Sequence, residues 1–510
     1  MTKTLGTLVQ ATPGARLVTG DPDTRISSIT HDSRTVRPGA LFVALPGHRF
    51  DGTAFVADAV RQGAVAVVSE RGEPTAPVGW VVVPGARAAL ADLAAAWWDR
   101  PAERLRLIGV TGTDGKTTTT RLIGSLLAAG GRPCGWYTTA DLKIGEAIRP
   151  NEEHHTTPEA DRVQAVLAAI RDAGATYAVL EASSHALAQE RLHGASFDVG
   201  VFTNLSPEHL DYHGTLEAYL EAKGRLFTML GEPTTKTGAR YAVLNADQPA
   251  SARLRALCRV PVVTYGLEAE ADVRAEEVRE SLDGFRATVV SGAGRWELTT
   301  RFVGRHNVAN WLAAVAVALR EGVPAEVIQE AARTIEPPPG RLQPVRCGQP
   351  FGVYVDFAHT PQALRAALAA VRAGTTGRVL LAFGHAGNRT RANRPELGRI
   401  AAELADYFVI TNDDAYPEDP EAIADAIEAG VRQAGAAAGQ QYLRCLDRRQ
   451  AIRHLLARAA PGDVVLLAGK GHEAFLHVEA VAQPWSDVTV AEELLAELGY
   501  NSPGARAVER

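Results

Sequence analysis

Short apolar runs alternate with amphipathic stretches along most of the chain, a pattern typical of α/β domains in which helices cover a parallel sheet. Residues 1–102 form the first such segment. Its strands are predicted at 41–45, 64–69 and 80–83, and its helices at 53–62 and 88–98. Asp99-Arg100-Pro101 then interrupts the pattern and marks a boundary.

Two further segments repeat this pattern. Residues 103–336 begin with a buried strand and continue with strands and helices in alternation, which predicts a mainly parallel sheet covered on both faces. Pro337-Pro338-Pro339-Gly340 is the clearest linker in the chain and opens the third segment, 337–498, with a tail at 499–510. The strands of these two segments are predicted at 105–110, 177–180, 198–202, 353–356, 379–383, 408–411 and 464–467.

Composition narrows the class of protein. The chain has 510 residues, a formal net charge of -6 and 46% hydrophobic residues, so we expect a globular protein that binds neither nucleic acid nor membrane. Residues 1–12 lack an apolar core, and the four cysteines are far apart with no metal-binding spacing. We therefore expect no signal peptide, a cytoplasmic location and a monomer.

Lysine is rare in this arginine-rich chain. The six lysines are Lys3, Lys116, Lys143, Lys223, Lys236 and Lys470, and three of them fall within the motifs described below. Lysine and arginine differ in shape, hydration and reactivity, so the retained lysines are candidates for positions where a primary amine is required.

A glycine-rich loop follows the first strand of the second segment. It reads Gly112-Thr113-Asp114-Gly115-Lys116-Thr117-Thr118 and opens a helix predicted at 116–129. Glycines let backbone amides turn towards phosphate oxygens, the lysine reaches the terminal phosphates, and Thr117 can ligate magnesium. The strict P-loop pattern requires glycine at 110, where this chain has valine, so the match is to a shorter form. The alternative is a glycine-rich turn that contains a lysine by chance.

Potential metal ligands follow the next two strands. Glu181 ends one strand and is placed either to bind Mg²⁺ or to cap a helix. The stretch 203–214 is dense in polar residues, and the helix after it places Tyr219, Lys223 and Phe227 on one face. From spacing alone, Lys223 is an ordinary surface lysine.

These motifs, in this order, resemble those of the Mur ligase family over nearly the whole chain. The resemblance implies three domains: an N-terminal uridine-nucleotide-binding α/β domain, a central P-loop ATPase domain and a C-terminal Rossmann-like domain. The motifs that carry it are the loop 112–118, Glu181-Ala182-Ser183-Ser184-His185, the stretch 204–213 with Ala222-Lys223, 304–310, Pro339-Gly340-Arg341 and 355–361.

The resemblance also implies roles for individual residues. Lys116 and Thr117 would bind the phosphates of ATP and one magnesium ion, Glu181 would ligate that ion, and His209 would ligate a second. The residue matching Lys223 is carbamylated in this family, which converts an amine into a metal-binding carboxylate. We expect Lys116, His209 and Lys223 to take part directly in catalysis. Asn307 would contact adenine, while Arg341 and Asp356 would contact ribose or phosphate. Asp114 departs from the usual asparagine.

The N-terminal segment resembles the branch that adds the third amino acid to the cell-wall precursor UDP-MurNAc-L-Ala-D-Glu. Thr30-His31-Asp32-Ser33-Arg34 and the stretch 47–52 match its uridine-nucleotide domain, which implies contacts from Ser33 and His48. In this branch, ATP phosphorylates the γ-carboxyl of glutamate and the incoming amine attacks the acyl phosphate. The residues matching those that hold the muramoyl-dipeptide are Thr156, Thr157, Ser183, Gln189 and Arg191.

The identity of the third amino acid depends on a stretch in the last segment. Diaminopimelate enzymes of the branch have Asp-Asn-Pro-Arg where this chain has Asp413-Asp414-Ala415-Tyr416. An acid thus replaces the asparagine, and a tyrosine replaces the arginine that would grip a distal carboxylate. The other residues matching this pocket are Arg389, Gly469 and Glu473, with Arg389 placed to hold the α-carboxylate. We therefore expect lysine or ornithine in preference to meso-diaminopimelate, unless Arg391 or Arg394 replaces the missing arginine.

Two other classes compete with this interpretation. A folylpolyglutamate-synthase-like ligase would share the ATPase module but lack the N-terminal motifs. A P-loop binding module without ligase chemistry would need neither Lys223 with His209 nor a third domain carrying Gly469-Lys470-Gly471-His472-Glu473.

Overall fold

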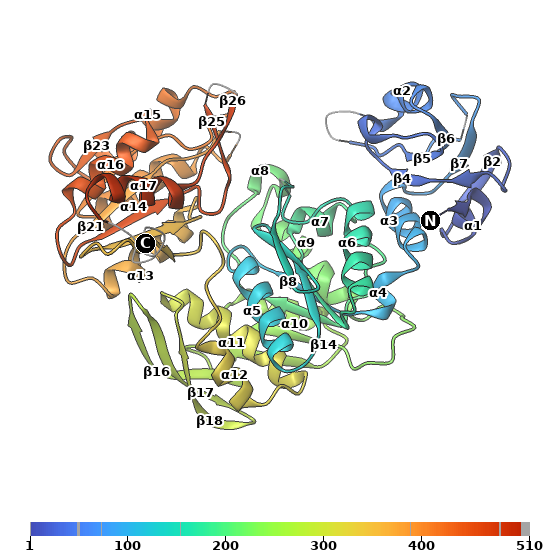
Figure 1. Ribbon diagram of the computed structural model, residues 1–510. Helices are drawn as coiled ribbons and strands as arrows, with labels where there is room; N and C mark the ends of the chain where they lie inside the picture. The colour runs from blue at the N-terminus through green and yellow to red at the C-terminus, as the bar shows by residue number, and fades with distance from the viewer. Residues whose placement is uncertain are drawn as a thin grey trace, which may run out of the picture.

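The computed structural model describes residues 2–47, 51–72, 74–153, 155–387, 389–478 and 481–500. The chain folds into three α/β domains, which Figure 1 shows as a blue region, a region from cyan through green to yellow, and an orange to red region. None of the helices described is long and apolar enough to cross a membrane.

The N-terminal domain has a five-stranded sheet in the order β2-β7-β6-β5-β4, in which only β2 is antiparallel to its neighbour. The strand predicted at 64–69 is confirmed, but the helix predicted at 53–62 is shorter. It begins as a 3₁₀ turn, Gly52–Phe55, because the Asp51 carboxylate accepts a hydrogen bond from the backbone N–H of Thr53. The elements are β1 Lys3–Thr4, α1 Leu5–Gln10, β2 Arg16–Thr19, β3 Arg25–Ile26, β4 Ser28–Thr30, β5 Ala40–Val43, α2 Val56–Arg61, β6 Ala64–Ser69, β7 Gly79–Val82 and α3 Ala86–Trp97.

The central domain has an eleven-stranded sheet in the order β11-β10-β9-β12-β8-β13-β14-β15-β16-β17-β18. Neighbours from β9 to β16 are parallel, and antiparallel hairpins extend both edges. The strands are β8 Arg106–Thr111, β9 Cys134–Tyr137, β10 Asp141–Ile144, β11 Ala147–Pro150, β12 Tyr177–Glu181, β13 Val199–Phe202, β14 Tyr241–Asn245, β15 Val262–Gly266, β16 Val273–Ser281, β17 Gly284–Ser291 and β18 Gly294–Thr300.

Helices cover both faces of this sheet. The alternating side chains of β8 show the two layers, because Ile108 and Val110 pack with the helices α5, α11 and α12, whereas Leu107 packs with α6, α7 and α9. The central helices are α4 Pro101–Arg104, α5 Lys116–Ala129, α6 Ala160–Asp172, α7 Ser184–Ala188, α8 Leu210–His213, α9 Leu216–Met229, α10 Ala250–Leu257, α11 Arg305–Arg320 and α12 Ala325–Ala332.

The C-terminal domain has a six-stranded sheet in the order β19-β20-β24-β21-β22-β23, parallel except for β19. Its strands are β19 Gln343–Pro344, β20 Gly352–Asp356, β21 Val379–Phe383, β22 Tyr407–Ile410, β23 Tyr442–Arg444 and β24 Val464–Ala468, followed by the hairpin β25 Phe475–Val478 and β26 Val481–Pro484. Its helices are α13 Pro361–Ala373, α14 Asn393–Leu404, α15 Pro420–Gln433, α16 Arg448–Arg458 and α17 Asp487–Glu497.

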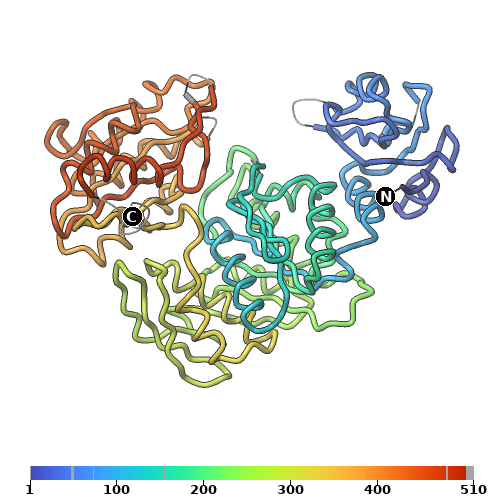
Figure 2. Tube along the Cα trace, viewed as in Figure 1, coloured from blue at the N-terminus to red at the C-terminus, as the bar shows by residue number. Residues whose placement is uncertain are grey.

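The C-terminal domain rests on the antiparallel extension of the central sheet, as the trace in Figure 2 shows. The Tyr354 hydroxyl donates to the backbone carbonyl of Leu282 at 2.8 Å, in the turn between β16 and β17. Non-glycine residues with positive φ mark both connections between domains, Arg100 at 47° and Leu342 at 45°. In the predicted tail, the Tyr500 ring packs on Phe351, and residues 501–510 lie outside the described part of the chain.

Candidate active site

The loop between β8 and α5 has the tight backbone of a phosphate-binding loop. Gly112 and Gly115 have φ values of 152° and 81°. A Cβ atom on Gly112 would lie 1.8 Å from the Thr203 hydroxyl, and one on Gly115 would lie 2.3 Å from the side-chain oxygen of Asn310. Both positions therefore require glycine, and the loop leads directly to the N-terminus of α5, where backbone amides favour an anion.

Two lysine side chains converge on this loop. Lys116 Nζ donates to the carbonyl oxygens of Gly112 at 3.0 Å and Thr113 at 2.8 Å. Lys223 Nζ, from α9, donates to the same Gly112 oxygen at 2.8 Å. Lys223 is 1% exposed, and burial together with the charge of Lys116 holds its pKa well below the ordinary value. Lys223 is thus not the surface lysine that spacing alone indicates, and two amines this close favour an anion beside them.

Glu181 collects hydrogen-bond donors at the end of β12. Its carboxylate accepts from the Thr117 hydroxyl at 2.7 Å, from the backbone N–H of Thr139 at 2.8 Å and from the Thr139 hydroxyl at 3.1 Å. Ser183, rather than Glu181, caps the next helix, α7. The structure therefore favours the metal-binding alternative for Glu181 over the helix-cap alternative.

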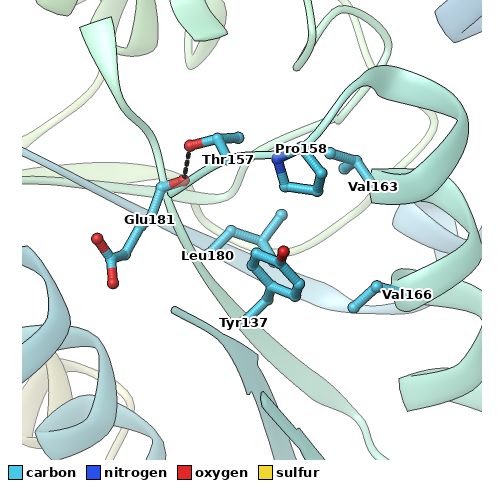
Figure 3. Close-up of a pocket in the computed structure, with 7 residues that line it drawn as sticks. All are labelled: Tyr137, Thr157, Pro158, Val163, Val166, Leu180 and Glu181. Carbon is cyan, nitrogen blue, oxygen red and sulfur yellow. Dashed lines mark hydrogen bonds between the residues drawn. The ribbon is translucent and has the colours of Figure 1, made fainter. Parts of the chain in front are cut away.

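A small apolar hollow lies behind this strand. Figure 3 shows the Glu181 carboxylate turned away from the hollow, while the Thr157 hydroxyl donates to the Glu181 carbonyl at 2.7 Å. The hollow is lined by Tyr137, Thr157, Pro158, Val163, Val166, Leu180 and Glu181. The Glu181 carboxylate thus faces Thr117 and Thr139 and not the hollow.

Glu208 joins the central and C-terminal domains. Its carboxylate lies 3.7 Å from His209 Nε2 and 3.8 Å from Nε2 of His359, which follows β20. Burial acts to raise the pKa of Glu208, but His359 and His209 hold it well below the ordinary value. Burial and neighbouring cations lower the pKa of His209 to about 4, so its ring is neutral near pH 7, as a metal ligand must be.

Arg341 reaches the phosphate loop from the connection between these two domains. Its Nη2 lies 3.5 Å from the Thr117 hydroxyl. Leu342 follows with a positive φ, and its backbone N–H donates to the Asp356 carboxylate at 2.7 Å. This bond fixes the turn that directs Arg341 towards α5.

Asn307 is buried at the start of α11, with 3% of its surface exposed. Its side-chain nitrogen donates to the Val303 carbonyl, and its oxygen accepts from Asn310, which abuts Gly115. Asn307 is therefore linked to the phosphate loop through Asn310, and a contact with adenine stays a prediction.

The residues expected to hold the dipeptide lie close to one another and to the carboxyl end of β12, where Glu181 is located. Thr157 accepts a hydrogen bond from Arg191 through its carbonyl at 2.9 Å, and Arg191 also donates to Gln189 at 2.8 Å. The Ser183 N–H donates to the Thr157 hydroxyl at 3.1 Å. Thr156 is joined to the same group, because its hydroxyl accepts from Thr139.

The N-terminal domain meets this region through helix α3, which packs on α6 and places Arg87 3.8 Å from Glu159, and through the segment around Ser33. Ser33 begins a 3₁₀ turn, Ser33–Thr35, and the preceding His31 lies 3.1 Å from Asp161 at the start of α6. His48, expected to bind the nucleotide, lies outside the described residues.

An acidic cluster lies at the carboxyl ends of β22 and β24, where Asp413, Asp414 and Glu473 surround a lysine. Lys470 Nζ lies 2.9 Å from Asp414, 2.6 Å from Glu473 and 3.9 Å from Asp413, and its side chain has no exposed surface. Gly469 is required here, since a Cβ atom would lie 2.7 Å from the Asp413 carboxylate. Three carboxylates therefore face one ammonium.

Tyr416 closes one side of the cluster. Its hydroxyl lies 3.3 Å from Asp414, and its ring packs 4.8 Å from that of His477. Asp414 also accepts a hydrogen bond from the His477 backbone N–H at 2.8 Å. Lys470 therefore already contacts the carboxylate that distinguishes this stretch from that of the diaminopimelate enzymes.

The neighbouring arginines divide into two groups. Arg391 and Arg394 each lie 3.1 Å from the same carboxylate oxygen of Glu418, which balances one of their two positive charges. Arg389 is exposed, and its charge helps to lower the pKa of His209 and His385. Arg389 thus lies within electrostatic range of His209 and His385.

Comparison with known proteins agrees with this geometry. Three family descriptions match the chain: Mur ligase family, catalytic domain, at residues 25–98; Mur ligase middle domain at 110–318; and Mur ligase, glutamate ligase domain, at 340–471. A protein of Roseiflexus sp. strain RS-1, named UDP-N-acetylmuramyl-tripeptide synthetase, is 45% identical over 93% of this chain and 95% of its own length. The chain belongs to the Mur ligase family.

Other members are also similar along their whole length. A Geobacillus thermodenitrificans protein named UDP-N-acetylmuramoyl-L-alanyl-D-glutamate--2,6-diaminopimelate ligase is 41% identical over 97% of this chain and 99% of its own. A Deinococcus radiodurans protein named UDP-N-acetylmuramyl-tripeptide synthetase is 41% identical over 93% of this chain and 96% of its own length. A solved structure with the same name as the Geobacillus protein has a TM-score of 0.68 and 31% identity, over 98% of this chain and 100% of its own.

As a Mur ligase, this protein is an ATP-dependent enzyme that forms amide bonds and requires Mg²⁺. Its residues fit both ligands. The glycines of the loop leave no room for side chains, Lys116 supplies positive charge, and Thr117 with Glu181 offers hard oxygen ligands. Burial and Glu208 raise the pKa of Asp114, so this unusual carboxyl is more readily neutral than an exposed one and repels phosphate less.

Four residues of this Mur ligase site had no role assigned from the sequence. Glu208 contacts the expected metal ligand His209, His359 contacts Glu208, Thr139 donates to Glu181, and Lys470 pairs with the carboxylates of the acidic cluster. The rarity of lysine was the one signal that pointed to Lys470. Glu208 and His359 meet only when two domains pack together, and their distance in sequence concealed the contact.

Proposed function

We propose that this Mur ligase joins a diamino acid to the D-glutamate γ-carboxyl of UDP-MurNAc-L-Ala-D-Glu, which makes the tripeptide precursor of peptidoglycan. The observation that carries the proposal is the placement of three groups around the phosphate loop. The Thr157–Arg191 group adjoins Glu181, whose carboxylate accepts from Thr117. Glu208 contacts His359 of the C-terminal domain, and that domain carries the acidic cluster.

The residues divide the work of an acyl-phosphate reaction. Lys116 neutralises charge on the γ-phosphate while ATP phosphorylates the glutamate carboxyl, and the amine of the third substrate then displaces phosphate from the acyl phosphate. Thr117 and Glu181 would hold one Mg²⁺, and His209 with carbamylated Lys223 a second. Bound magnesium supplies electrostatic stabilisation of the transferring phosphoryl group.

A basic diamino acid fits the C-terminal site better than diaminopimelate does. The acidic cluster retains an excess of carboxylates over Lys470, which favours a distal ammonium and repels a distal carboxylate. Tyr416 offers no guanidinium, and Glu418 pairs with both Arg391 and Arg394. We therefore favour lysine or ornithine, with meso-diaminopimelate as the alternative, since related proteins carry names of both kinds.

The experiment is phosphate release by the purified protein with ATP, Mg²⁺ and UDP-MurNAc-L-Ala-D-Glu, comparing ornithine, lysine and meso-diaminopimelate. Release that depends on ornithine or lysine supports the proposal. Release with diaminopimelate alone would retain the tripeptide ligase but reverse the choice of amino acid. If none of the three supports release, a folylpolyglutamate-synthase-like reaction becomes the better interpretation.

Glu181→Gln should raise the Mg²⁺ concentration needed for half-maximal rate about tenfold, because the amide keeps its acceptor oxygen but loses the charge that attracts the ion. The measurement is the initial rate against Mg²⁺ at saturating ATP. Glu428→Gln is the matched control, since Glu428 is a buried carboxylate in α15 that accepts from Tyr442. An unchanged Mg²⁺ requirement in Glu181→Gln would remove Glu181 from the metal site.

A further inference from the structure

Arg448 and Asp487 form an ion pair whose two side chains have no exposed surface. Arg448 is the first residue of α16 and Asp487 the first of α17. The guanidinium donates through Nε and Nη2 to the two carboxylate oxygens at 2.8 Å and 2.6 Å, a bidentate geometry that fixes its plane. Trp485 Nε1 donates to the same carboxylate at 2.8 Å, which holds Asp487 in place.

The other hydrogen bonds of Arg448 go to the backbone of two site loops. Nη1 donates to the carbonyl of Asn412 at 3.2 Å, and Nη2 donates to the carbonyl of Ala468 at 2.9 Å. Asn412 directly precedes Asp413, and Ala468 directly precedes Gly469. One rigid guanidinium therefore connects the loop that carries Asp413, Asp414 and Tyr416 with the loop that carries Gly469, Lys470 and Glu473.

Stability alone does not explain this pair. Removing two charges from water is costly, and an apolar pair of similar volume often packs as well or better. An apolar pair could not, however, donate hydrogen bonds to two carbonyls at once. The positive charge of Arg448 also interacts with the cluster. Burial acts to lower the pKa of Arg448, whereas Asp487 and then Asp413 and Asp414 raise it.

We propose that Arg448, oriented by Asp487, is a positioning residue for the amino-acid site. Arg448 holds the loops after β22 and β24 at a fixed distance from each other. At that distance, the carboxylates of the two loops can bind the distal group of the incoming amino acid. This inference rests on the proposed function, because it assumes that the acidic cluster receives the third substrate.

The test uses two variants of the whole enzyme. Arg448→Lys keeps the charge but cannot donate to Asp487 and both carbonyls with one planar group. Arg448→Met/Asp487→Leu removes both members of the ion pair, so neither charge is left buried without its partner. This double variant is therefore expected to fold and to keep the test informative if Arg448→Lys does not. Both variants should raise the KM for the amino acid at least about tenfold and leave the KM for ATP within about twofold of the parent value. Both should also reduce the differences in kcat/KM between lysine, ornithine and diaminopimelate.

Arg378→Lys is the matched control. Arg378 pairs with the buried Asp463 at 2.6 Å, at the amino ends of β21 and β24, opposite the site. It should lower the melting temperature and leave the KM for the amino acid unchanged. The inference is overturned if the Arg448 variants have a lower melting temperature but an unchanged KM for the amino acid. It is also overturned if their KM values for ATP and for the amino acid rise together. A parent enzyme that releases no phosphate with any amino acid would refute the proposed function instead.

Discussion

Lys223→Arg is expected to lower kcat roughly a thousandfold, the magnitude seen when a key electrostatic contact to the transferring group is lost. A carbamate forms only on an uncharged primary amine, which a guanidinium does not provide. The position is suited to that chemistry, because Lys223 is almost fully buried and its nitrogen lies 2.8 Å from a loop carbonyl that also accepts from Lys116. Steady-state phosphate release with all three substrates measures the effect.

Two additional measurements separate the chemistry of Lys223 from its packing. Bicarbonate labelled with ¹³C should give a carbamate carbon signal in the parent enzyme and none in Lys223→Arg. Lys236→Arg is the matched control, since Lys236 is also largely buried but pairs with Asp198 near the amino ends of the strands. It should retain the rate and the signal. Full activity of Lys223→Arg would exclude a carbamate from the mechanism.

The parts of the fold that follow from local pattern were predictable from the sequence. The strands at 64–69 and 379–383 and the helix at 116–129 have the predicted bounds, because apolar runs and a glycine-rich start define them locally. The hairpins β16 to β18 were not anticipated. Their strands alternate apolar and charged residues at an edge of the sheet, and only the turns at Gly284 and Gly294 mark them.

The site residues that belong to a continuous motif could be predicted from the sequence. Those whose position depends on an unusual backbone conformation or on packing between distant segments could not. His209 and Tyr416 have φ values of 55° and 51°, which ordinary residues adopt only when their surroundings impose it. Nothing in the sequence marks either as strained. The rarity of lysine points to Lys470, but its pairing with Asp414 could not be predicted, because it depends on two strands that are far apart in the chain.

Asp414→Asn/Tyr416→Arg should raise kcat/KM for meso-diaminopimelate, relative to that for lysine or ornithine, by roughly 10²- to 10³-fold over the parent. The double variant restores the Asp-Asn-x-Arg arrangement and supplies a guanidinium for a distal carboxylate. Asp414→Asn removes one negative charge, while its amide oxygen can still accept from Lys470 and the His477 N–H. Because φ at position 416 is positive for either side chain, the exchange alters chemistry more than backbone strain.

The measurement is kcat/KM for the three amino acids with parent, single and double variants. Tyr416→Gln is the control, since it removes the ring that packs on His477 without adding a guanidinium, and it should weaken all three substrates alike. Arg389, the residue expected to hold the α-carboxylate, is unchanged in all variants, so the change in preference reports the distal group. If the parent already prefers diaminopimelate, another cation reads that carboxylate, and Arg389, exposed beside His209, becomes the first residue to replace.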